Sequence, residues 1–396
     1  MTWSAPLTRL FKPLLSPRTV AVGLEIGTSS LKVVELQGGA PPRLLALGLR
    51  PTPPGLIQDD QIIDPEGLGR ELGALFKDAG IDRRFVVSAV SNRLAITRNI
   101  QMPKMPLRDL ERAIPWEAER YIPFPLDEVA IDHYILDNPS DVADGGEVEV
   151  VIAAARLDMV TQLTEGLKTA GLEPTVIDIK PFALLRALKG SLQGERFNRT
   201  TIFDKNYTDE SEVGVVLEIA ASSSTVTLVR GERVVMNRNL GVSGDDFTSA
   251  LQRAFGLDFD AAEEVKLAHG SALMPSPEED ALSTDGRFER FSPVRVHEAL
   301  RPVLADLTTE IRRSLEFFRV QSGDASISQM FLAGGGAKLR GLPEAIGRSL
   351  GFKVTFGDPW LTVVPGERYE SSYLERLAPE FGVPLGLALR GVMGLD

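Results

Sequence analysis

The sequence of 396 residues has no cysteine, only three histidines and no long apolar run. Without cysteine the chain has no disulfide, no thiol nucleophile and no thiolate ligand for a metal. The histidines lie far apart, so we expect no zinc site built on closely spaced histidines. Because no run of about 18 apolar residues occurs, we expect no membrane-spanning segment. Charged residues interrupt residues 1–19, so we expect no signal peptide and a cytoplasmic location.

The charge balance limits the choice of partners. The chain has 55 acidic and 43 basic residues and a net charge of -12, which argues against non-specific binding of nucleic acid, because such binding needs a basic face. The length allows two or three domains. In residues 1–19, Pro6 and Pro13 limit an apolar helix. We therefore expect a loose tail or a strap on the body rather than a helix that docks on lipid.

Residues 20–39 predict a β-hairpin with a polar tip. Such a tip presents backbone N–H groups and hydroxyls together, which suits phosphate. Glu25 precedes the tip and Lys32 follows it; an acid can hold a metal or a water, and a lysine can meet a phosphate as a point charge. The tip consists of Gly27, Thr28, Ser29 and Ser30.

The same pattern returns at residues 213–232, without a gap, when Glu25 is set over Glu218. Two such hairpins, one near the start of each half of the chain, predict a duplicated domain that binds one ligand. The alternative is two ordinary β-hairpins, because turns that contain glycine are common. The serines of the two tips then coincide, Ser222 with Ser29 and Ser223 with Ser30.

Other local signals place the remaining elements. Asp64, Pro65 and Gly80 predict a capped helix at 65–79. A helix at 107–121 contains Pro115, which should kink or break it near Ile114. A strand runs into Gly334, Gly335 and Gly336. Three glycines there allow a flat ligand to approach the backbone closely.

The order of strands and helices predicts an α/β fold with a compact α+β insertion. The predicted parts are a tail at 1–19, a first domain at 20–95 and 177–205, the insertion at 96–176, a second domain at 206–245 and 327–378 with a subdomain at 246–326, and a C-terminal helix at 379–396 that returns to the core.

Three segments resemble the PilM family, the cytoplasmic actin-like proteins of type IV pilus assembly, within the superfamily of actin, Hsp70 and sugar kinases. They read GLEIGTSSLKVVEL at 23–36, WEAERYIPFPLDEV at 116–129 and AGGGAKLRGLPEAI at 333–346. The resemblance covers most of the chain, and the division protein FtsA is the nearest relative of that family. It implies a two-domain actin-like (ribonuclease H-like) ATPase fold that holds ATP and Mg²⁺.

The resemblance also implies partners. It implies docking of the cytoplasmic N-terminal tail of PilN beside the inserted subdomain, contact with PilO and PilP through PilN, and a place on the inner-membrane platform that serves the pilus assembly ATPase. For the groove, Trp116, Tyr121 and Phe124 are the candidates. The alternative is that these three residues form the core of the insertion.

The resemblance assigns site residues by position. Glu25 and Glu218 would face Mg²⁺ through its waters and serve any catalysis. The alternative for Glu263 and Lys266 is an ordinary surface pair at i,i+3 spacing. Nucleotide-binding roles fall on Gly27, Thr28, Ser29 and Lys32 for the phosphates, Ser222 and Ser223 near the terminal phosphate, Gly244, Glu263 and Lys266 around the ribose and adenine, and Gly334, Gly335 and Gly336 under the nucleoside.

The sequence departs from the family pattern at several of these positions. The family usually has Asp at the place of Glu25, and often Gly at the place of Ala220. Ser243 replaces the first glycine of a usual pair. Phosphoryl transfer depends on accurate placement of water and metal, so we expect ATP binding with weak or no hydrolysis. The hypotheses are an ATP-binding scaffold, an active ATPase or small-molecule kinase, and an FtsA-like membrane-tethered filament.

Overall fold

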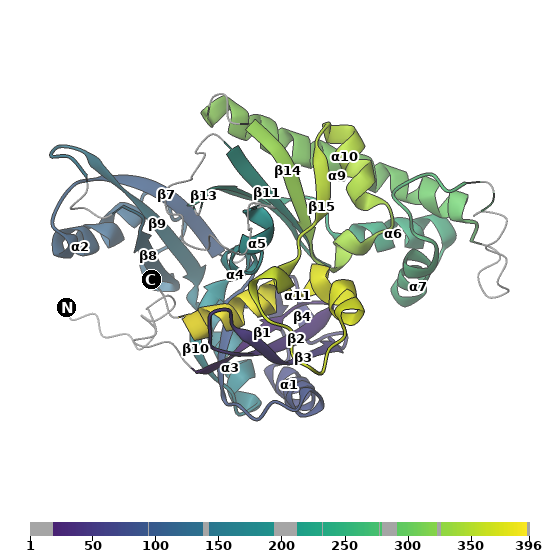
Figure 1. The fold of residues 1–396 in the computed structure, drawn as a ribbon, viewed down its shortest axis with the longest axis horizontal. Coiled ribbons are helices and arrows are strands. Elements are labelled where there is room, and N and C mark those ends of the chain that lie inside the picture. Colours follow the sequence, from purple (N-terminus) through teal and green to yellow (C-terminus); the bar gives the residue numbers. More distant parts are fainter. Residues whose placement is uncertain are drawn as a thin grey trace. The chain divides into compact units, whose positions relative to one another are not determined.

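The computed structural model describes residues 19–93, 95–137, 142–193, 212–231, 233–276, 278, 291–322 and 326–393. The chain divides into two units (Figure 1). The first comprises Met1–Ala187, Thr362–Tyr369 and Val383–Asp396, and the second Leu188–Leu361 and Glu370–Gly382. The tail predicted at 1–19 lies outside the described residues except for its last residue.

Five strands form the main sheet of the first unit, in the order β10-β6-β1-β2-β3. Strands β1, β2 and β3 run antiparallel, and β6 and β10 extend the sheet parallel to β1. Valine and leucine dominate β1 and β2, which are buried along most of their length, as expected for central strands. The bounds are β1 (Val20–Ile26), β2 (Ser30–Gln37), β3 (Arg43–Pro51), β6 (Phe85–Val90) and β10 (Glu173–Ile179).

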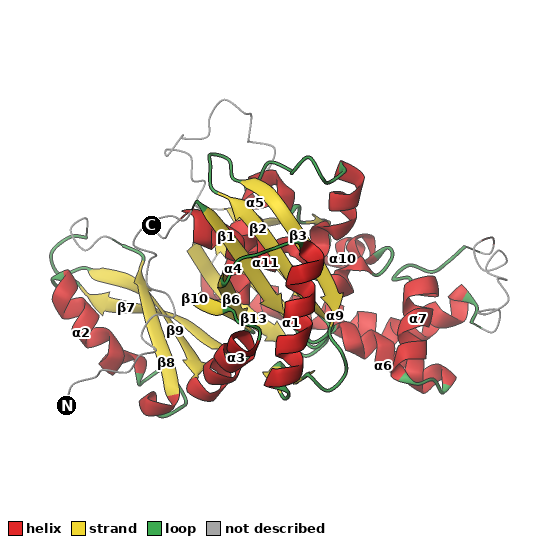
Figure 2. Ribbon diagram, turned by 90° about the horizontal axis from the view of Figure 1, so that it is seen from below, coloured by secondary structure: helices red, strands yellow, loops and turns green. Residues whose placement is uncertain are grey.

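Helices α1 (Pro65–Ala79) and α3 (Leu157–Thr169) pack together on one face of this sheet (Figure 2). Helix α1 has the predicted bounds: the side chain of Asp64 accepts a bond of 2.8 Å from the N–H of Gly67, and Gly80 ends the helix in a left-handed conformation. Both helices bury an apolar stripe. A short hairpin of two strands with two residues each, β4 (Ile57–Gln58) and β5 (Gln61–Ile62), lies before α1.

On the opposite face of the sheet, the backbone of β1 lies directly against the backbone of the second half of helix α11 (Ser371–Met393). A Cβ on Gly23 would lie 2.1 Å from the carbonyl oxygen of Pro384, so only glycine fits there. The sequence predicted this returning helix at 379–396, but it begins earlier and continues through Pro379 and Pro384. Close packing offsets the hydrogen bonds that the prolines remove.

A buried ion cluster links the same helix to strand β10. Asp178 is fully buried, and its Oδ2 accepts from Arg390 at 2.9 Å and from Arg186 at 3.2 Å. Arg186 lies on α4 (Lys180–Ala187) and also donates to the carbonyl of Gly386 on α11, at 2.9 Å. Burial by itself would raise the pKa of Asp178, but the two guanidinium groups outweigh burial and lower it.

The insertion folds as a three-stranded sheet in the order β7-β9-β8, with one helix packed on it. Of the predicted kink or break near Ile114, the break does not occur: the helix continues past Pro115, which is exposed, to Ala118. The insertion was predicted to extend to residue 176, yet α3 packs in the core of the main sheet and β10 pairs with β6. Its elements are β7 (Ala95–Pro103), α2 (Leu107–Ala118), η1 (Leu126–Glu128), β8 (Val129–Ile135) and β9 (Glu147–Arg156).

The second unit contains a five-stranded sheet in the order β13-β12-β11-β14-β15. Its strands are β11 (Glu212–Ile219), β12 (Ser224–Arg230), β13 (Arg233–Leu240), β14 (Ser326–Ala333) and β15 (Lys353–Phe356). Its helices are α5 (Lys189–Leu192), α6 (Gly244–Phe255), α7 (Phe259–His269), α9 (Pro293–Ser322), α10 (Leu342–Leu350), the turns η3 (Gly335–Lys338) and η4 (Pro359–Thr362), and the first part of α11. Trp360 is buried in this unit and donates to the carbonyl of Leu374 at 2.8 Å.

The two sheets repeat one connectivity. In each, a three-stranded antiparallel meander is followed by two strands parallel to its first strand. Setting Glu25 over Glu218 places Glu35 on Leu228, and a bulge follows both positions. A shared bulge is a designed feature rather than a chance irregularity. The repeat therefore goes well beyond two ordinary hairpins and supports the duplicated domain predicted from the sequence.

Candidate functional site

The tip of the first hairpin is a tight turn held by strand β3. The N–H of Gly27 donates to the carbonyl of Ser30 at 3.1 Å. Thr52, just past β3, donates through Oγ1 to the carbonyl of Gly27 at 2.7 Å and through its N–H to Ser29 at 3.0 Å. The structure thus brings Gly27, Thr28 and Ser29 together in one ordered loop. No local pattern in the sequence indicates Thr52, because its role depends on how β3 pairs.

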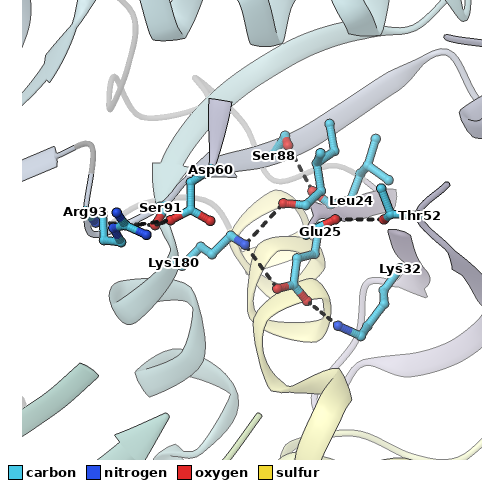
Figure 3. A network of polar contacts seen from close by, with 11 residues as sticks. Leu24, Glu25, Lys32, Thr52, Asp60, Ser88, Ser91, Arg93 and Lys180 are labelled. Atoms are coloured by element: carbon cyan, nitrogen blue, oxygen red, sulfur yellow. Dashed lines mark hydrogen bonds and ion pairs between the residues drawn. The ribbon is translucent and has the colours of Figure 1, made fainter. Parts of the chain in front are cut away.

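Glu25 lies between two lysines at the base of this loop (Figure 3). Its Oε2 is 3.2 Å from the Nζ of Lys32, and its Oε1 is 3.3 Å from the Nζ of Lys180. Lys180 also donates to the carbonyl of Ile26 at 3.1 Å. Burial would raise the pKa of Glu25, but the two ammonium groups outweigh burial and lower it. Glu25 is therefore an ionised, buried counter-ion.

Direct coordination of Mg²⁺ by the carboxylate of Glu25 does not fit this arrangement. Both carboxylate oxygens already accept from ammonium groups, whereas Mg²⁺ needs oxygen ligands at about 2.0–2.1 Å in octahedral geometry. Within the described ranges, no group of three or more histidine, aspartate or glutamate side chains is placed to hold a metal. The predicted contact of Glu25 with Mg²⁺ through its waters stays a prediction, and the sequence could not show that Lys180 lies beside Glu25.

A small pocket of about 30 Å³ opens beside the loop. Its polar lining includes Thr28, Lys180, Asp60 and Gln162. Asp60 has φ of 64° and accepts from Ser91 Oγ at 2.9 Å. A volume of this size suits one or two waters rather than a nucleotide, so this pocket alone cannot hold a nucleotide.

The second hairpin makes the same turn but is held differently. The N–H of Ala220 donates to the carbonyl of Ser223 at 2.9 Å, as Gly27 does to Ser30. The first N–H groups of helix α6, those of Gly244 and Asp245, donate to the carbonyls of Ala220 and Ala221 at 2.8 and 2.9 Å. Ser222 and Ser223 lie in this turn. The start of α6 therefore fixes the loop, which no local pattern foretold.

Helix α6 begins at Gly244, directly after its N-cap residue Ser243. The N–H of Ser243 donates to the carboxylate of Asp246 at 2.8 Å, half of a capping box. Burial raises the pKa of Asp245, Glu263 and Asp246 add to that rise, and Lys266 opposes it.

Glu263 and Lys266 form more than an ordinary surface pair. Their ion pair is 2.6 Å long, and the Lys266 side chain is only 14% exposed. Lys266 Nζ also donates to Thr248 Oγ1 at 2.7 Å and to the carbonyl of Gly244 at 3.3 Å. The two residues thus belong to a network that ties α7 to the first turn of α6.

The three positions after β14 are glycine for different structural reasons. Gly334 has φ of 89°, and a Cβ there would lie 2.3 Å from the carbonyl oxygen of Ile219. A Cβ on Gly336 would lie 2.5 Å from the Ile219 side chain. A Cβ on Gly335 meets only Glu380 Oε2, at 3.9 Å. Packing against β11 therefore explains Gly334 and Gly336, whereas Gly335 borders open space that a ligand can approach.

An aromatic surface marks the end of α2 in the insertion. Trp116 is 77% exposed, Tyr121 40% and Phe124 38%. The core of the insertion is formed instead by residues such as Leu110, Ile114 and Val150. The alternative that these three aromatic residues form that core is therefore wrong, and they are available to a partner.

The chain is similar to proteins of type IV pilus assembly. A model of the family described as type IV pilus assembly protein PilM matches residues 23–283 and 287–392. A solved structure described as the PilM-PilN type IV pilus biogenesis complex is 44% identical, with a TM-score of 0.78, and the match covers 94% of this chain and 98% of that chain.

Two curated relatives are the cell division proteins FtsA of Agrobacterium fabrum and of Rhizobium meliloti. They are 31% and 32% identical over 160 residues, which are 38% of this chain and 36% of each relative. The match therefore spans about a third of the length of these relatives. Within the part of the chain that the structure describes, no helix combines the length and apolar character needed to cross a bilayer.

Proposed function

The chain belongs to the family of the type IV pilus assembly protein PilM and has its actin-like fold, and from that premise we propose that it is an ATP-binding scaffold that docks the cytoplasmic tail of PilN. It acts on the cytoplasmic side of the inner membrane, reached through PilN. PilO, PilP and the pilus assembly ATPase are its indirect partners. The observation that carries this proposal is the 44% identity over nearly the whole of a protein solved as a PilM-PilN complex.

ATP binding is assigned to the two repeated loops and the glycine turn. In the first unit, the Gly27–Ser30 turn offers backbone and hydroxyl donors, and Lys32 adds a cation beside them. In the second unit, the Ser222 and Ser223 hydroxyls lie in the matching turn. Gly335 supplies the close approach that a nucleoside needs, since packing does not account for its missing side chain.

Calorimetric titration of the full chain with ATP tests this assignment. We expect Lys32→Met and Gly335→Val each to weaken ATP binding at least tenfold, because one removes a phosphate cation and the other fills the nucleoside approach. Lys77→Met is the matched control, since Lys77 is exposed on α1. Wild-type protein that does not bind ATP contradicts the proposal.

Docking of the PilN tail is assigned to the aromatic surface of Trp116, Tyr121 and Phe124. Exposed aromatic residues are frequent hot spots of protein interfaces. We expect Trp116→Ala to weaken binding of a synthetic PilN N-terminal peptide at least tenfold, measured by calorimetry. Leu267→Ala, at a residue 74% exposed on α7, should leave peptide affinity unchanged.

Nucleotide tunes the peptide surface in this proposal. A ligand shifts a conformational equilibrium only through its different affinity for the two states. The peptide should therefore bind more tightly to the ATP-loaded protein, and Lys32→Met should lose that gain. Equal peptide affinity with and without ATP refutes the coupling while leaving both binding sites in place.

A further inference from the structure

The carboxylate of Glu25 is bracketed by two ammonium groups inside the first unit (Figure 3). Lys32 takes one oxygen and Lys180 the other, at 3.2 and 3.3 Å. The side chains are nearly buried, with exposed fractions of 7% for Glu25, 10% for Lys32 and 13% for Lys180. Glu25, Lys32 and Lys180 together carry one net positive charge, while Asp60, which lines the same pocket as Lys180, pairs with Arg93 at 4.0 Å and accepts from Ser91 at 2.9 Å.

Lys180 is anchored where it stands. It follows β10 directly, and its Nζ donates to the carbonyl of Ile26 as well as to Glu25. Moving it away would leave a buried carboxylate short of a partner and a buried ammonium without one, which is costly. A divalent cation at Glu25 would also face two ammonium groups on the same carboxylate and be repelled by both.

The cluster faces the phosphate loop. Lys180 lines the small pocket together with Thr28 of that loop, and Lys32 pairs across the hairpin with Glu25. A net positive charge at this place attracts a polyphosphate without help from a metal.

We propose that Lys180 is the resident counter-ion of Glu25 and takes the place that a divalent cation would need, so that the first hairpin binds the phosphates of a nucleotide without a metal on Glu25. This inference rests on the proposed ATP binding. Lys180 acts as a positioning residue: it fixes the carboxylate and leaves the charge of Lys32 in excess.

The test is the ratio of ATP dissociation constants measured by calorimetry in EDTA and in excess Mg²⁺, on the full wild-type chain. A ratio within threefold of one supports the inference. A loss of tenfold or more in EDTA overturns it, while the proposed ATP binding survives. Absence of ATP binding in both buffers overturns the proposed function, and the inference falls with it.

Variants sharpen the same measurement. Lys180→Met frees an oxygen of Glu25, so we expect ATP binding to weaken at least fivefold in EDTA and to recover with Mg²⁺. Lys180→Arg keeps the cation and should keep the wild-type ratio, and so should the surface control Lys77→Met. If Lys180→Met does not fold, the double variant Glu25→Gln with Lys180→Met removes both charges and should bind ATP equally in the two buffers. A metal requirement in that double variant, or a wild-type ratio in Lys180→Met, contradicts the role of Lys180.

Discussion

The two hairpins share one backbone plan and differ in what holds their loops. Glu25 pairs across strands with Lys32, and Glu218 pairs in the same register with Thr225. The first unit builds a buried ion cluster on its glutamate, whereas the second presents a neutral hydroxyl at the matching position. The first loop is tied by Thr52 and the second by the start of α6. A duplicated scaffold thus keeps its register while its chemistry diverges.

The largest expected effect comes from breaking the buried charges of the first unit. Asp178→Asn leaves the guanidinium groups of Arg390 and Arg186 without their buried counter-ion. Loss of one partner from a buried ion pair costs about 3–5 kcal/mol. We expect a loss of that size in the free energy of unfolding, measured by urea titration. The double variant Asp178→Asn with Arg390→Met removes one of the two unpaired cations and should recover part of the loss, and no recovery would contradict a charge-based cause.

A smaller effect should separate the glycines of the second unit. Gly336→Ala forces a Cβ against Ile219 at 2.5 Å, and overpacking of this kind costs about 1–3 kcal/mol. Gly335→Ala should stay within about 0.5 kcal/mol of wild type, as surface changes do. Equal losses of stability in the two variants would show that packing explains the glycine at position 335 as well, and would contradict the assignment of Gly335 to ligand approach.

The smallest expected effect is a difference in acid response. Glu25 and Asp178 have lowered pKa values in the fold, so they stabilise the first unit above the ordinary carboxyl range and lose this contribution as the pH falls through their folded pKa. In the second unit, burial raises the pKa of Asp245 and Asp358. These two carboxyls cost stability when ionised, and acid relieves that cost.

Hydrogen exchange read by mass spectrometry between pH 7 and pH 3 can follow each unit separately. Protection should fall first in the strands of the first unit. Earlier loss of protection in the second unit would contradict the assignment of the buried charges.

Local signals in the sequence predicted the elements that depend on local causes. The bounds of α1 follow from its caps and apolar spacing, which act within one turn. The start of α11 could not be predicted in this way, because a packed helix carries Pro379 through its interior. The end of the insertion was misplaced, since only tertiary packing shows that α3 belongs to the main core.

In the candidate site, the sequence predicted the turns of the hairpins but not the ion pairs around Glu25. Gly27, Thr28 and Ser29 form the predicted turn at the tip of the first hairpin. Lys180 was missed because β10 brings it to Glu25 from a distant part of the chain. Gly334 and Gly336 were assigned to a ligand, although the end of β11 presses on both. These contacts join residues that are distant in the sequence, so local sequence patterns could not predict them.

The placement of two indoles gives the protein a pair of internal optical reporters. Trp116 stands in solvent on the insertion, and Trp360 is buried in the second unit with its N–H bonded. With Trp3 replaced by phenylalanine, red-shifted emission would follow events on the peptide surface, and blue-shifted emission would follow the integrity of the second unit. One unlabelled sample could therefore separate docking from unfolding by wavelength alone.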